Sequence, residues 1–322
     1  MSVFDAFVRL EGTLDGSVIS GESMARHTTY CIGGPAALYV ECASVPDLAL
    51  TCDVLLEEGV RWSVVGKGSN LLVSDEGFDG AVMVLGKGFA ACDFGELEKD
   101  DTHENALEPG QDYRVSAGAG VALATLVEKA GNYGLSGLEF ACGIPGTVGG
   151  AVFMNAGSGD TWIESRVSTC TVYKPGEGLR IIYNDDIDWE YRASNLPADE
   201  IIVEAAFNLK TASADEIEKR MKMRYDERAL AQPLSQRSCG SVFKNPPDRS
   251  AASLIRGCGL AGKTRGGAQI STLHANFIVS DGSATAADVC ALIELARDRV
   301  KETYGIELRP EVRFLGFPEK PE

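Results

Sequence analysis

Two glycine-containing segments of the 322-residue sequence have residue types and spacing that suit the binding of a nucleotide cofactor. The first offers exposed backbone amides and short polar side chains, which can hold a pyrophosphate without cationic side chains. It reads Gly66-Lys67-Gly68-Ser69-Asn70-Leu71. The second contains too much glycine and proline for a regular helix or strand and has apolar neighbours. It reads Gly143-Ile144-Pro145-Gly146-Thr147-Val148-Gly149-Gly150-Ala151. A flat apolar ligand against bare backbone, together with a pyrophosphate, indicates a flavin dinucleotide.

Two other nucleotide-binding patterns fit the sequence less well. Residues 257–264 match the P-loop pattern G-x-x-x-x-G-K-[ST], but that loop requires a strand before it and a helix after it. Residues 250–256 look helical instead, and Arg265-Gly266-Gly267 is a poor start for a helix. The segment at Gly66 lacks the third glycine of a Rossmann fingerprint and precedes a strand-like run. We therefore expect neither a P-loop hydrolase nor a Rossmann domain.

The charge of the chain restricts its partners. Thirty Lys and Arg against 47 acidic residues give a net charge of −17, which repels nucleic acids and anionic membranes. Between residues 220 and 268, however, ten Lys and Arg face three acidic residues. We expect a pocket for an anionic ligand there, no nucleic-acid partner and no obligate protein partner.

The cysteine and histidine patterns favour a reduced protein without a bound metal. The nine cysteines are an odd number without a C-x-x-C pair, and the three histidines form no metal or triad pattern. No basic and apolar leader is visible at the N-terminus. The uncharged stretch 140–159 is long enough to cross a membrane, but six glycines and a proline interrupt it. We expect a cytoplasmic protein without membrane insertion.

Helices and strands that could position the two loops follow from local patterns. Strands are expected at 38–42, 62–65, 71–73, 81–85, 114–117, 277–280 and 311–315, and helices at 44–59, 122–133, 214–232 and 285–304. The runs 71–73 and 81–85 suggest hairpins. Residues 93–112 hold eight acids against one Lys and are expected to form a mobile solvated connection. A boundary near Lys210 gives two α+β domains, 1–210 and 211–322.

Several separated motifs resemble those of the UDP-N-acetylenolpyruvoylglucosamine reductase (MurB) family, in the same order and over nearly the whole chain. They are Val64 to Val73, Gly137 to Phe140 continuing to Asn155-Ala156-Gly157, Tyr191-Arg192-Ala193-Ser194, Gln232-Pro233-Leu234, Ser238 to Pro246, Gly266 to Gln269, His274 to Ile278 and Pro310 to Arg313. The Gln-Pro-Leu and Ser-Cys-Gly-Ser segments look like the shorter of the family's two subtypes.

This resemblance implies a fold and an activity. The fold would be α+β, with a two-part FAD-binding domain like that of vanillyl-alcohol oxidase and a C-terminal α+β substrate-binding domain. The activity would be the FAD-dependent reduction of UDP-N-acetylglucosamine enolpyruvate to UDP-N-acetylmuramate in peptidoglycan precursor synthesis, with NADPH as hydride donor. The partners would then be two small molecules, the UDP-sugar enolpyruvyl ether and NADPH.

The resemblance also assigns roles to individual residues. Hydride delivery to the enolpyruvyl group leaves a carbanion that needs a positioned cation and a proton donor. The implied catalytic residues are Arg192 for the substrate carboxylate, Ser241 as proton donor and Glu311 as a neutral hydrogen-bond donor. The two glycine-containing segments are implied to bind FAD. The implied substrate contacts are Arg228, Gln232, Lys244 and Asn245.

Three positions depart from the family pattern. Cys31 stands where Arg or Lys is usual, Lys67 where a third glycine is usual, and Ser158-Gly159 where an Ala-Tyr pair is common. Lys67 could replace the cation missing at Cys31 if the two are close in space. A flavin-dependent oxidase and a non-catalytic nucleotide-sugar binder remain as alternatives, as do ligand contact and structural packing for His274.

Overall fold

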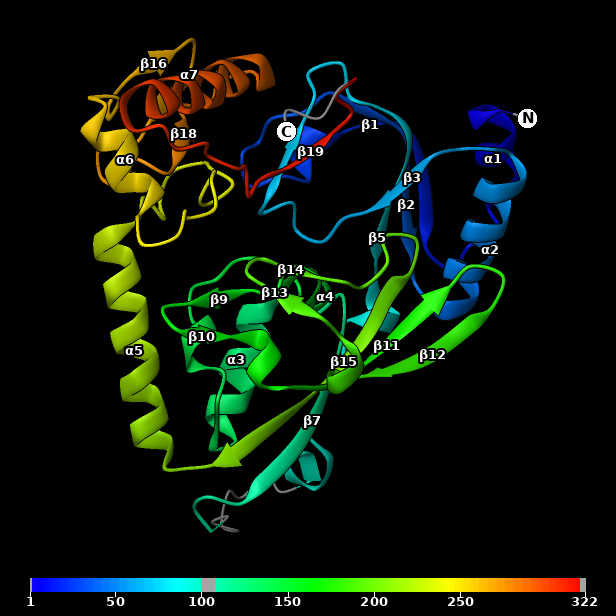
Figure 1. Ribbon diagram of the computed structural model, residues 1–322. Helices are drawn as coiled ribbons and strands as arrows, with labels where there is room; N and C mark the ends of the chain where they lie inside the picture. The colour runs from blue at the N-terminus through cyan, green and yellow to red at the C-terminus, as the bar shows by residue number, and fades with distance from the viewer. Residues whose placement is uncertain (1, 100–107, 319–322) are drawn as a thin grey trace. The chain divides into compact units, whose positions relative to one another are not determined.

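A computed structural model describes residues 2–99 and 108–318 of the chain (Figure 1). The described chain forms two units that are interleaved in sequence. Among the described residues, unit 1 comprises 2–19, 39–66, 82–99 and 108–227, and unit 2 comprises 20–38, 67–81 and 228–318. The expected domains 1–210 and 211–322 divide the chain only once, whereas unit 2 also takes in two N-terminal segments. The sequential division remains a prediction.

An antiparallel sheet forms the centre of unit 1. Its strands follow the order β12-β11-β15-β7-β6, and β8 also pairs with β15. The central strand β15 is buried at eight of its eleven positions, because side chains on both of its faces pack against other elements. The bounds are β6 (Cys92–Asp93), β7 (Asp112–Gly118), β8 (Leu135–Ser136), β11 (Val167–Lys174), β12 (Gly178–Tyr183) and β15 (Ile201–Thr211). Figure 1 shows β11, β12 and β15 side by side.

Two helices cover the core of this sheet. In α3 (Leu123–Asn132), Leu123, Leu126, Val127 and Ala130 are buried, which is the spacing of a single helix face. The shorter α4 (Val148–Phe153) contributes three buried residues to the same core. The remaining short elements of unit 1 are η2 (Lys87–Phe89), η3 (Gly95–Lys99), η4 (Glu139–Ala141), β9 (Gly157–Ser158), β10 (Thr161–Trp162), η5 (Ile163–Ser165), η6 (Asn184–Asp186), β13 (Trp189–Glu190) and β14 (Ala193–Ser194).

The N-terminal part of the chain contributes two packed helices, α1 (Val3–Leu10) and α2 (Val45–Glu57). The helix predicted at 44–59 is confirmed as α2, because the Ser44 side chain accepts a hydrogen bond from the Asp47 amide and caps it. A second sheet has the order β1-β2-β5-β3. Its bounds are β1 (Ser17–Ser23), β2 (Pro35–Cys42), β3 (Trp62–Val64) and β5 (Phe78–Leu85), with η1 (Met24–Arg26) following β1.

The core of unit 2 lies around α7 (Ala286–Tyr304), whose N-terminus has the predicted cap: Thr285 and Asp288 form a reciprocal capping box. Tyr30 is fully buried in this core and donates to the Ile278 carbonyl at 2.8 Å. Around α7 lie α6 (Ala251–Gly257) and the sheet β16 (Thr264–Arg265), β17 (Ala268–Ile270) and β18 (Ile278–Ser280). The long helix α5 (Ala214–Ala231) contributes residues to both units.

Two predictions from the sequence, the hairpin at 71–85 and the absence of a P-loop at 257–264, can be compared with the structure. Residues 71–73 and 81–85 do not form a hairpin, because β4 (Leu71–Val73) pairs in parallel with the C-terminal strand β19 (Arg313–Leu315), and β5 joins the second sheet. The P-loop interpretation of 257–264 fails as expected, because helix α6 precedes the segment and strand β16 follows it. The expected acidic connection at 93–112 contains residues 100–107, which lie outside the described residues.

Candidate active site

The glycine-rich segment 143–151 is anchored in unit 1 by Thr147. The Thr147 side chain is buried and accepts a hydrogen bond at 3.3 Å from the Gly150 amide, which caps α4. Gly66, just after β3, packs against this cap: a Cβ atom on Gly66 would lie 2.5 Å from the Thr147 Oγ1. The two predicted flavin segments therefore meet here, and Gly66 is required because no side chain fits.

The backbone of this segment is held by the connection between β7 and α3. Leu123 donates to the Gly146 carbonyl at 3.1 Å, and Val148 donates to the Val121 carbonyl at 2.9 Å. Gly143 and Gly146 have φ of 77° and 127°, where side chains are disfavoured. A Cβ atom on Gly149 would lie 2.8 Å from the Ala119 Cβ. Ile144 packs on the core, Ala151 is buried, and Pro145 and Gly150 are exposed.

Arg192 lies at the turn of the β13–β14 hairpin and has a φ of 59°, which is rare for a residue with a side chain. Its Nη1 donates to the Gly157 carbonyl at 3.0 Å. The guanidinium carbon lies 4.9 Å from the centre of the Trp162 ring, within cation–π range. The buried Asn155 donates to the Glu190 carbonyl at 3.0 Å and ties the hairpin to β9. Arg192 is thus held on fixed backbone.

The phosphate-loop residues 67–71 belong to unit 2. Gly68 has a φ of 60°, and a Cβ atom there would lie 2.2 Å from the His27 carbonyl oxygen. The Asn70 side chain donates to the Glu311 carbonyl at 3.0 Å, and the Asn70 carbonyl accepts from the Arg313 amide at 2.9 Å. The loop that was predicted to bind pyrophosphate is therefore joined directly to the strand that follows Glu311. Lys67 is exposed.

Ser241 and Glu311, which are 70 residues apart, are brought together in unit 2 by backbone pairing. The Glu311 amide donates to the Val242 carbonyl at 2.7 Å, and the Lys244 amide donates to the Arg309 carbonyl at 2.9 Å. Phe243 also forms a bridge with Pro310. Both catalytic candidates are partly exposed. The neighbouring Cys239 is buried, which raises its pKa to about 12 and keeps its thiol protonated at neutral pH.

The predicted substrate contacts occupy the basic region of the sequence. Gln232 is bound to α5 through a hydrogen bond of 2.8 Å from its amide to the Arg228 carbonyl. The Gln232 Oε1 atom is buried and has no hydrogen-bond partner within the described part of the chain. Such an atom needs a partner from a ligand or from water. The Asn245 side-chain oxygen accepts from the Ala251 amide at 3.0 Å, so it also holds the start of α6.

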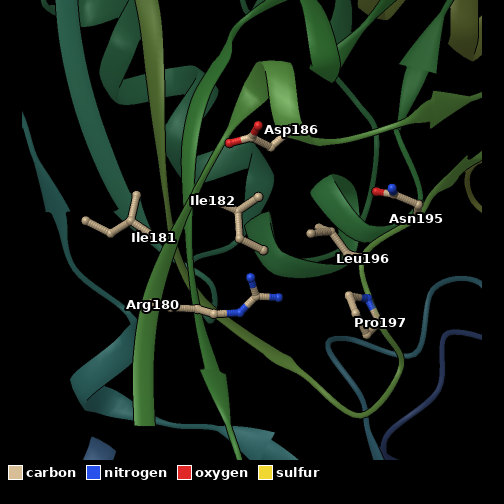
Figure 2. A pocket seen from close by; sticks show the side chains of 7 residues that line it. All are labelled: Arg180, Ile181, Ile182, Asp186, Asn195, Leu196 and Pro197. Carbon is tan, nitrogen blue, oxygen red and sulfur yellow. The ribbon is translucent and has the colours of Figure 1, made fainter. Parts of the chain in front are cut away.

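A pocket of about 320 Å³ lies elsewhere in unit 1, between β12 and the segment after β14 (Figure 2). In Figure 2, Ile182 and Leu196 point into the same space, whereas Ile181 points away from it. Arg180 at its wall is paired with Glu200 at 2.6 Å. The pocket is lined by Arg180, Ile181, Ile182, Asp186, Asn195, Leu196 and Pro197, none of which is a predicted site residue.

Residues 2–99 and 108–318 contain neither a cluster of metal-ligating side chains nor a membrane-spanning helix. No group of three or more His, Cys, Asp or Glu side chains is arranged to hold a metal ion. No helix in these ranges is long and apolar enough to cross a membrane.

Three residues that contact the candidate side chains or their backbone received no individual role from the sequence, although Asn155 and Asn276 lie within the motifs that resemble the family. Asn155 and Asn276 are 2% and 3% exposed, and Trp162 contacts Arg192. The signal for the two asparagines is a polar residue inside an apolar run, Met154-Asn155-Ala156 and Ala275-Asn276-Phe277. Buried amides in such runs need specific hydrogen-bond partners. The sequence around Trp162 carries no comparable signal.

Comparisons with known proteins agree with this organisation. A family model described as the C-terminal domain of UDP-N-acetylenolpyruvoylglucosamine reductase matches residues 232–315, and an FAD binding domain model matches residues 36–175. The UDP-N-acetylenolpyruvoylglucosamine reductase of Halalkalibacterium halodurans is 41% identical over 302 residues, covering 94% of this chain and 95% of that protein. Its counterpart from Heliobacterium modesticaldum is 43% identical over 303 residues, covering 94% and 91% respectively.

A solved structure shows the same fold. The crystal structure of UDP-N-acetylenolpyruvylglucosamine reductase from Thermus caldophilus has a TM-score of 0.74 and 32% identity, covering 94% of this chain and 99% of that chain. Together with the FAD binding domain match, it confirms the expected α+β fold class with an FAD-binding part.

Proposed function

This chain belongs to the UDP-N-acetylenolpyruvoylglucosamine reductase family, and we propose that it reduces UDP-N-acetylglucosamine enolpyruvate to UDP-N-acetylmuramate for peptidoglycan precursor synthesis. It is an FAD-dependent oxidoreductase that takes its hydride from NADPH and acts on small molecules. The observation that carries the proposal is the backbone pairing that joins Ser241 to Glu311 at Val242. We place its action in the cytoplasm.

Two cradles of bare backbone fit the FAD that the family implies. At Gly66 and at Gly68, a Cβ atom would meet another part of the chain at 2.5 and 2.2 Å. Backbone without side chains lets a ligand approach amide groups closely, which suits the pyrophosphate and one face of a flavin. We assign FAD contacts to residues 66–71 and to residues 143, 144, 145, 146, 147, 149, 150 and 151. When bound, FAD would supply the chemistry of hydride transfer between NADPH and the substrate.

Arg192 has the chemistry to bind the carboxylate of the enolpyruvyl group. The planar guanidinium offers two parallel donors to a carboxylate, and charge on that carboxylate rises as the hydride arrives. Its help is therefore greater in the transition state than in the ground state. The contacts with Gly157 and Trp162 support this assignment, because they hold the cation in one orientation before substrate binds.

Ser241 and Glu311 have the chemistry to handle the carbanion that hydride transfer leaves. In our assignment the Ser241 hydroxyl delivers a proton to the carbon that bears the new negative charge. Glu311, protonated, donates a hydrogen bond to the enediolate. Their adjacency supports both roles, since the two groups can reach one substrate only if their backbones are close.

The basic region from Arg220 to Ala268 suits the anionic diphosphate of a UDP-sugar. We assign substrate contacts to Arg228, Gln232, Lys244 and Asn245. The buried Gln232 Oε1 supports this assignment, because a sugar hydroxyl or a uracil N–H would supply the donor that it needs.

The test separates this function from the two alternatives. Purified protein should be yellow, should bleach under anaerobic NADPH, and should regain its colour when the enolpyruvyl UDP-sugar is added. Reoxidation by oxygen with no response to the enolpyruvyl substrate would indicate an oxidase. Protein that cannot take up FAD would leave only a nucleotide-sugar binder.

A separate measurement tests the proton donor. Ser241→Ala should bleach with NADPH at a near-normal rate and then be reoxidised by substrate about 10² to 10⁴ times more slowly, the usual size of general-acid catalysis. Unchanged reoxidation would remove Ser241 from the mechanism while leaving the overall activity in place.

A further inference from the structure

Asn276 forms an unusual set of contacts with the backbone that follows Ser241. Its side-chain oxygen accepts from the Phe243 amide at 3.0 Å, and its side-chain nitrogen donates to the Phe243 carbonyl at 2.8 Å. Its own carbonyl accepts from the Val242 amide at 2.8 Å. The side chain is 3% exposed, so these bonds form away from water. One buried residue thus pairs with Phe243 as a strand neighbour would.

The same short segment is held on its other side by the strand that carries Glu311. The Val242 carbonyl accepts from the amides of Glu311 and Val312 at 2.7 and 3.3 Å. Val242 therefore joins Asn276 to Glu311 through its two backbone groups. The separation between the backbones of Ser241 and Glu311 depends on where this one peptide lies.

The chain before Ser241 is anchored up to Cys239. The Ser238 carbonyl accepts a hydrogen bond from the Thr29 side chain at 2.7 Å, and Cys239 is buried. Gly240, with a φ of 80°, lies between this anchor and Ser241, and glycine backbone can adopt many conformations. On the other side of Ser241, Asn276 supplies three hydrogen bonds to Val242 and Phe243.

We propose that Asn276 is a positioning residue that acts through Ser241, by fixing the peptide that sets the direction of the Ser241 hydroxyl relative to Glu311. This inference rests on the proposed function, in which Ser241 delivers a proton. A buried amide is costly unless both of its polar ends are bonded. Both ends of the Asn276 amide are bonded to Phe243, which imposes a backbone geometry that an apolar side chain cannot impose.

The test is a double-mutant cycle on flavin reoxidation, measured by stopped flow after anaerobic reduction of the holoenzyme with NADPH. Asn276→Ala should slow reoxidation by the enolpyruvyl substrate by up to about 100-fold, since misplacing a reacting group by about 1 Å can cost about that much in rate. Reduction by NADPH should stay near the wild-type rate. In a Ser241→Ala background, Asn276→Ala should cause no further slowing, because the group that it positions is absent.

A matched control removes a buried hydrogen-bonding side chain from the same loop without touching Val242 or Phe243. Ser271 is 3% exposed, and its hydroxyl oxygen accepts from the amides of Leu273 and His274. Ser271→Ala should leave reoxidation near the wild-type rate. In FAD-free protein, the Val242 and Phe243 amides should exchange with deuterium faster in Asn276→Ala than in Ser271→Ala.

The possible outcomes test the positioning role of Asn276 and the proton-donor role of Ser241 separately. Effects of Asn276→Ala and Ser241→Ala that multiply would overturn the positioning role, as would equal amide exchange in the two loop variants. Ser241→Ala with normal reoxidation would instead defeat the proposed proton donor. If Asn276→Ala does not fold, Asn276→Asp enters the same cycle, because it keeps an acceptor for the Phe243 amide and loses the donor to its carbonyl.

Discussion

Gly66 allows a quantitative test of the cradle for the flavin. Its backbone is not in the left-handed region, so Gly66→Ala adds no dihedral strain. The new methyl group would meet the Thr147 Oγ1 at 2.5 Å, its Cγ2 at 3.2 Å and its Cβ at 3.4 Å. Thr147 can yield by rotating its hydroxyl away, and the hydroxyl then loses its hydrogen bond with Gly150.

The size of the effect follows from that lost cap. A threonine N-cap contributes about 1 kcal/mol, with a range of about 0.5–2. Gly66→Ala should therefore destabilise the FAD-free protein by about 1–2 kcal/mol, which lowers Tm by about 2–4 °C per kcal/mol in a unit of this size. FAD should also bind more weakly, measured by flavin fluorescence titration, because the displaced Thr147 belongs to the segment that we assign to FAD binding.

Thr147→Ala provides the decisive background. Because alanine lacks both the Oγ1 and the Cγ2, the nearest remaining atom at position 147 is the Cβ at 3.4 Å, an ordinary contact, so Gly66→Ala should then cost almost nothing. Gly150→Ala is the matched control for the stability of the FAD-free protein, because its Cβ would stay 3.5 Å from the same hydroxyl and alanine favours the helix. An equal cost of Gly66→Ala in both backgrounds would refute the clash as its cause.

Three further predictions concern other described residues. Trp162→Leu removes the cation–π contact with Arg192, worth about 0.5–1 kcal/mol, and should slow reoxidation by substrate about 2- to 5-fold in stopped flow without affecting reduction by NADPH. Burial lowers the pKa of His274 below 6.5, so the unfolded chain binds a proton at this residue at a higher pH than the folded chain does. The free energy of unfolding, measured in urea, should therefore decrease as the pH falls below 6.5, and His274→Gln should weaken this pH dependence. Iodoacetamide at pH 8 should label the exposed Cys31 in native protein and the buried Cys239 only after unfolding, and mass spectrometry that finds equal rates would contradict the burial argument.

Local sequence signals determined much of the secondary structure. The caps at Ser44 and Thr285 and the apolar spacing of 122–133 place α2, α7 and α3 within a few residues, because these signals act over one or two helical turns. The same local logic excluded a P-loop at 257–264, where a helix precedes and a strand follows. The motifs also predicted the FAD-binding fold and the family.

Only the tertiary structure decided which distant segments lie together. The pairing of β4 with β19 joins residues 71 and 313, and the pairing at Val242 joins Ser241 to Glu311. Neither leaves a trace in a short window of sequence, because a strand's partner is selected by the packing of the whole core. The predicted hairpin at 71–85 was wrong for this reason, since both segments found partners elsewhere.

The sequence by itself therefore determined which residue types are available for chemistry, and the tertiary structure decided which other residues hold them in place. The catalytic roles of Arg192, Ser241 and Glu311 are predictions from motifs that resemble the family, whereas Asn276 and Trp162 were singled out only by their contacts with residues far along the chain. The sequence can indicate that a buried amide needs hydrogen-bond partners, but not which residues those partners are. For Asn276 that partner is the Phe243 backbone, which only the folding of unit 2 brings next to it.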